Sequence, residues 1–432
     1  MKSNYHIFLS YKLILSILIF SFLSRLFTYF LPIPNITNLL VFPILSLFFL
    51  LFYPTVTSSY EQRNNILIFF FSLITLSSTF INNIPFINWF FFIIVICFPF
   101  FLFKFISCLD KNLYLIQKIH KILFTLILIN ILVSLFQYFI LGLRVDDIKG
   151  LFLGQGLGHH INGVINFFYS IYFFSLNKKN LKLKHLVIIS LCLFTNFISD
   201  TKTIILAALV IAIIMPIILL IGYVRAKPFR ENKIFFLSFF FSLLTILLIY
   251  LISKFINIPS ISHVNYNYLS YGLISKFKFF SYVNFQELKN YLLGYGPSMA
   301  TSKIAYMSNI TERYDYLLSF LGFNYSDLTI FIQKKELSNF ITHPTTGSSL
   351  FQLTFSHGAV IAEVGYLGFL LYLFLLINTF KSFIIDYFSF LIVLIIILMG
   401  FIFTWLEESI FIVFILCLLI CYKNLIVFKT SR

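Results

Sequence analysis

Apolar residues occur in long runs along nearly the whole chain, and shorter polar stretches separate one run from the next. Most runs approach the ~20 residues that an α-helix needs to cross a bilayer. The pattern predicts twelve transmembrane helices, at residues 8–30, 38–53, 66–81, 86–107, 122–143, 161–176, 186–199, 204–224, 234–256, 358–380, 388–404 and 410–428. One polar stretch, 257–349, is much longer than the others.

These elements predict an all-α polytopic membrane protein in three parts. Residues 1–256 carry helices 1–9, residues 257–349 form one large, partly helical outward loop, and residues 350–432 carry helices 10–12. The composition agrees, because 60% of the 432 residues are hydrophobic, 11% are charged and the mean hydropathy is +0.97. A chain this apolar is expected to lie in the lipid bilayer.

The distribution of basic residues predicts the orientation of the helices. Every second connection is basic. These connections hold Arg63; Lys111, Lys118 and Lys121; Lys178, Lys179, Lys182 and Lys184; Arg225, Lys227, Arg230 and Lys233; and Lys381. Positively charged connections stay in the cytoplasm, so both termini are expected there too. The net charge of +16 forms no continuous basic face, and nucleic acid is therefore not expected as a partner.

Three outward segments keep positive charge against this rule, and we expect function there. They are 144–160 with Arg144 and Lys149, the "SDTKT" turn with Lys202, and the 257–349 loop, which holds ten of the chain's 25 tyrosines. Tyrosine rings with polar edges suit sugar rings, although a belt of interfacial aromatic residues has the same composition.

The stretch 144–165 is the first candidate for binding an anion. It leads through four glycines into a helix whose first turn holds His159 and His160. Open backbone N–H groups at a helix start, with Arg144 nearby, favour a negatively charged group. A flexible outer loop with interfacial histidines is the alternative interpretation.

Two further cations are candidates for the same role. Lys202 lies between two closely spaced apolar runs, where ionisable residues often line a cavity. Arg313 is the only arginine of the large loop and suits a phosphate group. A structural pair of Asp200 with Lys202, and a surface ion pair of Arg313, are the alternatives.

Proton transfer is the second kind of chemistry that the sequence suggests. His343 opens the hydroxyl-rich stretch "HPTTGSSL" before the tenth helix, where an imidazole can accept a proton from a sugar hydroxyl. His357 and Glu363 lie at the start of that helix. Interfacial packing of His357 and a polar core position for Glu363 are the alternatives.

Three stretches resemble the superfamily of bacterial O-antigen polymerases (Wzy-type) and O-antigen ligases, and the resemblance covers most of the chain. They are "DDIKGLFLGQGLGHHING" at 146–163, "YLLGYGPSM" at 291–299, and the run from "SSLFQL" to "AEVGYLGFLLYL" at 348–373. The chain departs from many members in having Lys202 between helices seven and eight where they have an arginine, so a cation is kept but the bidentate fork is lost.

The resemblance implies a glycosyltransferase on the outer face of the bacterial cytoplasmic membrane. Its donor is a polyprenyl-diphosphate-linked glycan and its acceptor is a sugar hydroxyl of another lipid-linked repeat unit, with no metal, nucleotide or other cofactor. It also implies chain-length regulator and flippase proteins as partners. The residues assigned to the diphosphate are Lys202, Arg144, Arg313, His159 and His160, and those assigned to the acceptor are His343, His357 and Glu363.

Other functions remain open at this stage. An O-antigen ligase, which transfers polymer to lipid A core, shares almost all of these features. A transporter of lipid-linked glycan or solute also fits twelve helices, although no repeat relates the two halves and no loop after helix three matches the one after helix nine. A membrane scaffold is the last alternative.

Overall fold

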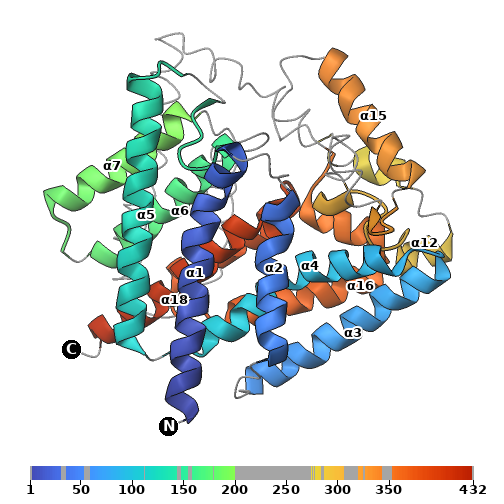
Figure 1. Ribbon diagram of the computed structural model, residues 1–432, viewed down its shortest axis with the longest axis horizontal. Helices are drawn as coiled ribbons and strands as arrows, with labels where there is room; N and C mark the ends of the chain where they lie inside the picture. Colours follow the sequence, from blue (N-terminus) through green and yellow to red (C-terminus); the bar gives the residue numbers. More distant parts are fainter. Residues whose placement is uncertain are drawn as a thin grey trace, which may run out of the picture.

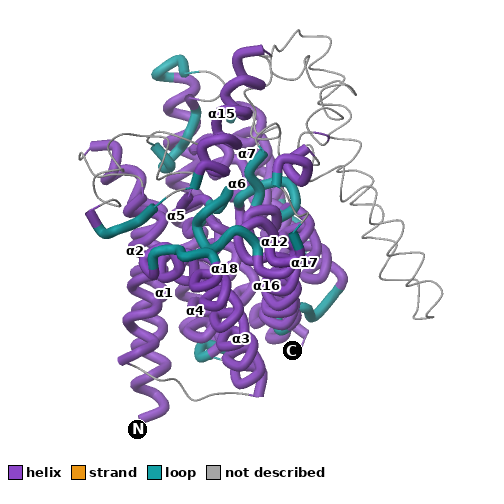
Figure 2. Tube along the Cα trace, turned by 90° about the vertical axis from the view of Figure 1, so that its right-hand side faces the viewer, coloured by secondary structure: helices purple, strands orange, loops and turns teal. Residues whose placement is uncertain are grey.

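The computed structural model describes residues 2–30, 36–52, 59–110, 112–143, 147–153, 158–178, 180–199, 274, 276, 278–283, 287–305, 320–324, 326–342 and 353–430. The main elements are α1 (Lys2–Phe30), α2 (Ile36–Phe52), α3 (Ser59–Ile81), α4 (Phe86–Ser107), α5 (Leu113–Phe139), α6 (Gly158–Asn177), α7 (Leu183–Ile198), α12 (Leu288–Leu293), α15 (Asp327–Thr342), α16 (Ser356–Lys381), α17 (Tyr387–Met399), the 3-10 helix η3 (Trp405–Glu407) and α18 (Ser409–Thr430). Within these residues the regular structure is entirely helical (Figures 1 and 2).

The protein is a helical membrane protein. In the described part of the chain, six helices are long and apolar enough to cross a bilayer, namely Ile7–Phe27, Gln62–Ile81, Phe86–Ser107, Leu113–Phe139, Ser356–Lys381 and Ser409–Phe428. Each of the other predicted helices before residue 200 and after residue 353 also overlaps a helix of the structure. The two predicted at 204–224 and 234–256 lie outside the described residues.

Capping residues explain where the structure departs from the hydropathy pattern. The fifth helix was predicted to begin at residue 122, but the Asn112 side chain accepts the Leu115 N–H at 3.3 Å and starts α5 nine residues earlier. It ends at Phe139 because Gly142, with a φ of +63°, lets the chain leave the helix. Hydropathy alone does not predict this first part of α5 as helix, because its lysines make it polar.

α18 is the central helix of the bundle. It contacts α1, α2, α4, α5 and α6, and the side chains from Ile410 to Tyr422 are buried around its whole circumference. Figure 1 shows α16 and α18 crossing α1 and α2 at a steep angle. A helix that is apolar on every side suits such complete enclosure by its neighbours.

The connections gather at two ends of the bundle. The first, the loop end, comprises the 82–88 turn, the 294–305 segment and the 400–408 connection, which hydrogen bonds and ion pairs join together. The second, the lysine end, comprises the connection between α4 and α5 and the connection before α17, both of which bond to the last part of α18.

Candidate active site at the loop end

The candidate site is built around a kink in α16. Gly365 has a φ of +68° within this helix. The kink leaves the carbonyl oxygens of Ala362 and Glu363 to accept the N–H groups of Tyr295 and Gly296, both at 2.9 Å. The segment after α12 is thereby joined to α16 through the backbone.

The Glu363 carboxylate fixes the conformation of the same segment. It accepts the backbone N–H groups of Ser298 at 2.6 Å, Ala300 at 3.2 Å and Ser302 at 2.8 Å. Glu363 has no exposed surface. Hydrogen bonds from several N–H groups are what a buried carboxylate requires, so Glu363 acts as a positioning residue that shapes the loop.

Two glycines allow this contact between α12 and α16. A Cβ atom on Gly365 would lie 2.2 Å from the Leu292 carbonyl oxygen, and one on Gly294 would lie 2.5 Å from the backbone of Glu363. Both glycines also have positive φ angles. Gly294 of the "YLLGYGPSM" stretch and Gly365 of the "AEVGYLG" stretch are therefore required by packing of one stretch on the other.

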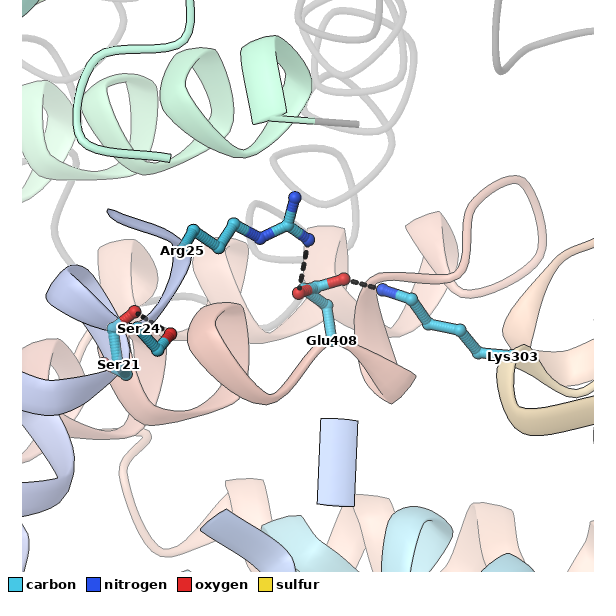
Figure 3. A network of polar contacts seen from close by, with 5 residues as sticks. All are labelled: Ser21, Ser24, Arg25, Lys303 and Glu408. Carbon is cyan, nitrogen blue, oxygen red and sulfur yellow. Dashed lines mark hydrogen bonds and ion pairs between the residues drawn. The ribbon is translucent and has the colours of Figure 1, made fainter. Parts of the chain in front are cut away.

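Beside this loop lies a cluster of buried charges (Figure 3). Arg25, near the end of α1, donates to a Glu408 oxygen at 3.2 Å, and the Lys303 ammonium contacts the other oxygen of the same carboxylate. The backbone N–H of Lys303 donates to Glu407 at 2.5 Å. Arg25 is 8% exposed, Glu408 7% and Glu407 2%. We call Arg25, Lys303, Glu407 and Glu408 the charge cluster.

Burial dominates the electrostatics of the charge cluster. Burial, together with the nearby Arg25 guanidinium, lowers the pKa of Lys303 to about 7, and Glu407 opposes this shift. Burial also raises the pKa of Glu407 to about 8, against the hydrogen bond from the Lys303 backbone. An anion that enters the cluster must compete with Glu408 for its two cations.

His357 lies close to this site but serves packing. Its side chain is fully buried, and the Nε2 atom lies 2.8 Å from the Ile397 carbonyl oxygen. The ring packs against Phe369 and Phe401, with centroids 5.5 and 4.3 Å away. These contacts favour the packing interpretation of His357 over contact with a substrate.

His159 and His160 begin α6 as the sequence suggested. Their ring centroids are 3.9 Å apart, with His160 buried and His159 half-buried. The N–H groups of Lys149 and Gly150, however, donate to the Gln137 side chain at 3.0 and 2.8 Å. Those two backbone donors are therefore already occupied, and they do not belong to an open anion site.

A buried amide network holds this region in place. Asn130 donates to Asn162 at 2.7 Å and accepts the Leu151 N–H at 2.9 Å. Asn162 in turn donates to the Ser199 hydroxyl at 3.0 Å. Since Ser199 is three residues before Lys202 in the chain, the network connects the start of α6 to the stretch that leads into Lys202.

Aromatic contacts join this region to the charge cluster. The Phe22 and Phe152 rings lie 5.3 Å apart, and Phe22 precedes Arg25 by three residues. The Phe168 ring of α6 lies 6.3 Å from the Trp405 ring of η3. The start of α6 and the charge cluster thus belong to the same side of the bundle.

Four of the predicted site residues lie outside the described residues, namely Arg144, Lys202, Arg313 and His343. The chain is described again after the His343 stretch, where Glu336 of α15 accepts the Leu353 N–H at 2.5 Å and Lys276 donates to the Thr354 carbonyl at 3.2 Å. Burial lowers the pKa of Lys276 to about 7.

Arg25, Glu407 and Glu408 were missed in the sequence, although a signal was present. Arg25 lies within the apolar run at 8–30, and the two glutamates lie between two apolar runs. Ionisable residues in such positions commonly face a partner or a cavity.

No group of three or more His, Cys, Asp and Glu side chains in the described ranges is arranged to hold a metal ion.

Comparisons with known proteins give no relative for this chain. No family model, no curated protein and no solved structure matches it.

Proposed function

We propose that the protein polymerises polyprenyl-diphosphate-linked oligosaccharide repeat units into O-antigen, capsule or exopolysaccharide on the outer face of the bacterial cytoplasmic membrane. In this proposal the chain has twelve spanning helices, cytoplasmic termini and an outward 257–349 loop. One observation carries it. Two of the three stretches that carry the resemblance, "YLLGYGPSM" and "AEVGYLG", pack on each other through Glu363, beside the buried Arg25 and the half-buried Lys303.

The proposed reaction is a glycosyl transfer. An acceptor hydroxyl oxygen attacks C1 of the donor sugar, the bond between C1 and the phosphate oxygen breaks, and the diphosphate leaves with the electron pair. The hydroxyl proton passes to His343. The diphosphate is already a good leaving group, so the protein has to hold its charge and align the hydroxyl.

Lys202, Arg144 and Arg313, with His159 and His160, are proposed to hold the diphosphate, and the charge cluster adds Arg25 and Lys303 to this group. The position of Lys303 supports its inclusion. The backbone N–H of its neighbour Ser302 donates to the Glu363 carboxylate, and its own backbone N–H donates to Glu407. Lysine and arginine are the usual ligands of phosphate oxygens.

The test uses purified protein in proteoliposomes with a defined polyprenyl-diphosphate-linked repeat unit. We expect a ladder of lengthened lipid-linked glycans. Lys202→Ala and Lys303→Gln should shorten or abolish the ladder, and Lys303→Arg should restore part of it. Lys423→Gln, at the lysine end, is the matched control and should leave the ladder unchanged.

Two outcomes contradict this function, and a third contradicts the assignment of Lys202 to the site. Transfer of polymer to lipid A core without lengthening of the repeat unit indicates a ligase. Movement of the lipid-linked glycan across the bilayer without lengthening indicates a transporter. A normal ladder from the Lys202→Ala protein removes that residue from the proposed site.

A further inference from the structure

A groove at the lysine end has two matched contacts between a lysine and an aromatic ring. It lies between the starts of α1 and α5, has a volume of about 200 Å³, and is lined by Ile7, Phe8, Asn112, Tyr114 and Leu115. It is remote along α1 from the charge cluster, since Arg25 lies near the far end of that helix.

Each helix places a lysine one turn after its aromatic residue. The Lys12 Nζ atom lies 4.6 Å from the Phe8 ring centroid, and the Lys118 Nζ atom lies 4.3 Å from that of Tyr114. Helical side chains lean towards the N-terminus, and a lysine in a membrane helix extends its ammonium group towards the interface. Both ammonium groups are therefore brought back to the level of the groove.

Neither ammonium group has a carboxylate partner within the described part of the chain. The acidic residue nearest to α5 in the sequence, Asp110, is bonded to Lys423 at 2.7 Å. Lys12 and Lys118 are both exposed, and the exposed face of α1 continues through Ser16 to Phe20. The groove thus combines two uncompensated positive charges with an apolar surface that runs into the bilayer.

From this charge complementarity we propose that the groove binds one anionic phospholipid. Its phosphate lies between the Lys12 and Lys118 ammonium groups, and an acyl chain follows the exposed face of α1. Basic pockets between membrane helices recognise lipid headgroups in this way. The proposal is independent of the glycosyltransferase proposed above.

The test titrates phosphatidylglycerol and phosphatidylcholine separately into delipidated protein in detergent and counts bound lipids by native mass spectrometry. We expect one phosphatidylglycerol to bind roughly tenfold tighter than phosphatidylcholine, as two lysines near a membrane surface allow. Lys12→Gln with Lys118→Gln should remove this preference, and replacement of both by Arg should keep it. Lys178→Gln with Lys184→Gln, two exposed lysines that lie just after α6 and in α7, is the matched control.

Several results overturn the proposal. Equal affinity of the wild-type protein for the two lipids shows that the headgroup is not recognised. An equal loss in the control pair shows a general effect of surface charge. A wild-type dimer that the Gln pair converts to monomer shows that a second copy of the chain occupies the groove. Melting curves of both variant pairs establish that they are folded.

Discussion

The two ends of the bundle differ in how far their charged residues are exposed. At the loop end, the buried Arg25 and the half-buried Lys303 share one carboxylate, and the backbone N–H groups of Ser302 and Lys303 each donate to a glutamate. At the lysine end, Lys118 and Lys121 are exposed on the surface of α5, and the Lys423–Asp110 pair is partly open to solvent.

This difference separates two uses of a positive residue in a membrane protein. An exposed lysine at a helix end costs little and is sufficient to retain a connection on one side of the membrane. A buried cation costs several kcal/mol unless it is paired, so its position must be specified by the fold. The loop end is therefore where a substitution should have specific effects.

The largest expected effect tests this contrast directly. Glu408→Gln removes the carboxylate that Arg25 and Lys303 share and should lower the free energy of unfolding by about 3–5 kcal/mol, because it leaves buried charge uncompensated. Lys423→Gln breaks the partly exposed pair with Asp110 and should cost at most about 1 kcal/mol. Denaturation in detergent micelles measures both. Equal losses in the two variants contradict the distinction between the ends.

A pair of glycines gives the next test. Gly365→Ala should cost about 2–4 kcal/mol, because a residue with a Cβ is strained at the positive φ of this position and the new Cβ would also meet the Leu292 carbonyl oxygen. Gly142→Ala has nearly the same φ, with no heavy atom within 4 Å, and should cost only about 1 kcal/mol. If the two variants have the same melting temperature, the contact between α12 and α16 contributes nothing beyond backbone strain.

A change of pH has the smallest expected effect when it is taken one pH unit at a time. Glu407, with a raised pKa of about 8, keeps its proton in the folded state, so its contribution to stability falls as the pH rises from about 4.5 to 8. Lys303, with a lowered pKa of about 7, loses its proton more readily when folded, so its contribution rises from about pH 7 to 10.5. Their combined contribution has a minimum near pH 7–8.

Variants separate these two contributions. Relative to the wild type, Glu407→Gln should remove the fall on the acid side, and Lys303→Met should remove the rise on the alkaline side, each by at most about 1.4 kcal/mol per pH unit. Melting temperatures measured across this range provide the test. Parallel curves for the wild type and both variants contradict the shifts assigned to these residues.

The strongest hydropathy signals predicted the fold well. The range 86–107 agrees with α4 as the structure has it, because Pro85 marks the start of a long, mostly apolar run. The start of α5 was misplaced because Asn112 begins that helix within a lysine-containing segment. Apolar length thus identifies a membrane helix, whereas capping residues decide where it begins.

The candidate site was less accessible to prediction. Glu363 and the 291–299 stretch were both selected from the sequence, but nothing local indicated that one holds the other. Arg25 and Glu408 are 383 residues apart, and no periodic pattern relates positions so distant. Pairing between the ends of different helices depends on how the helices pack, which hydropathy does not specify.

The central place of α18 bears on how the chain is assembled during translation. The helices that it contacts precede it in the sequence, so they enter the bilayer before their shared core has been synthesised. Until α18 has been inserted, the faces of α1, α4 and α5 that will contact it are not covered by this helix. Membrane insertion and final packing are therefore separate events in this protein, and a ribosome that stalls before residue 409 leaves a set of inserted helices with no centre.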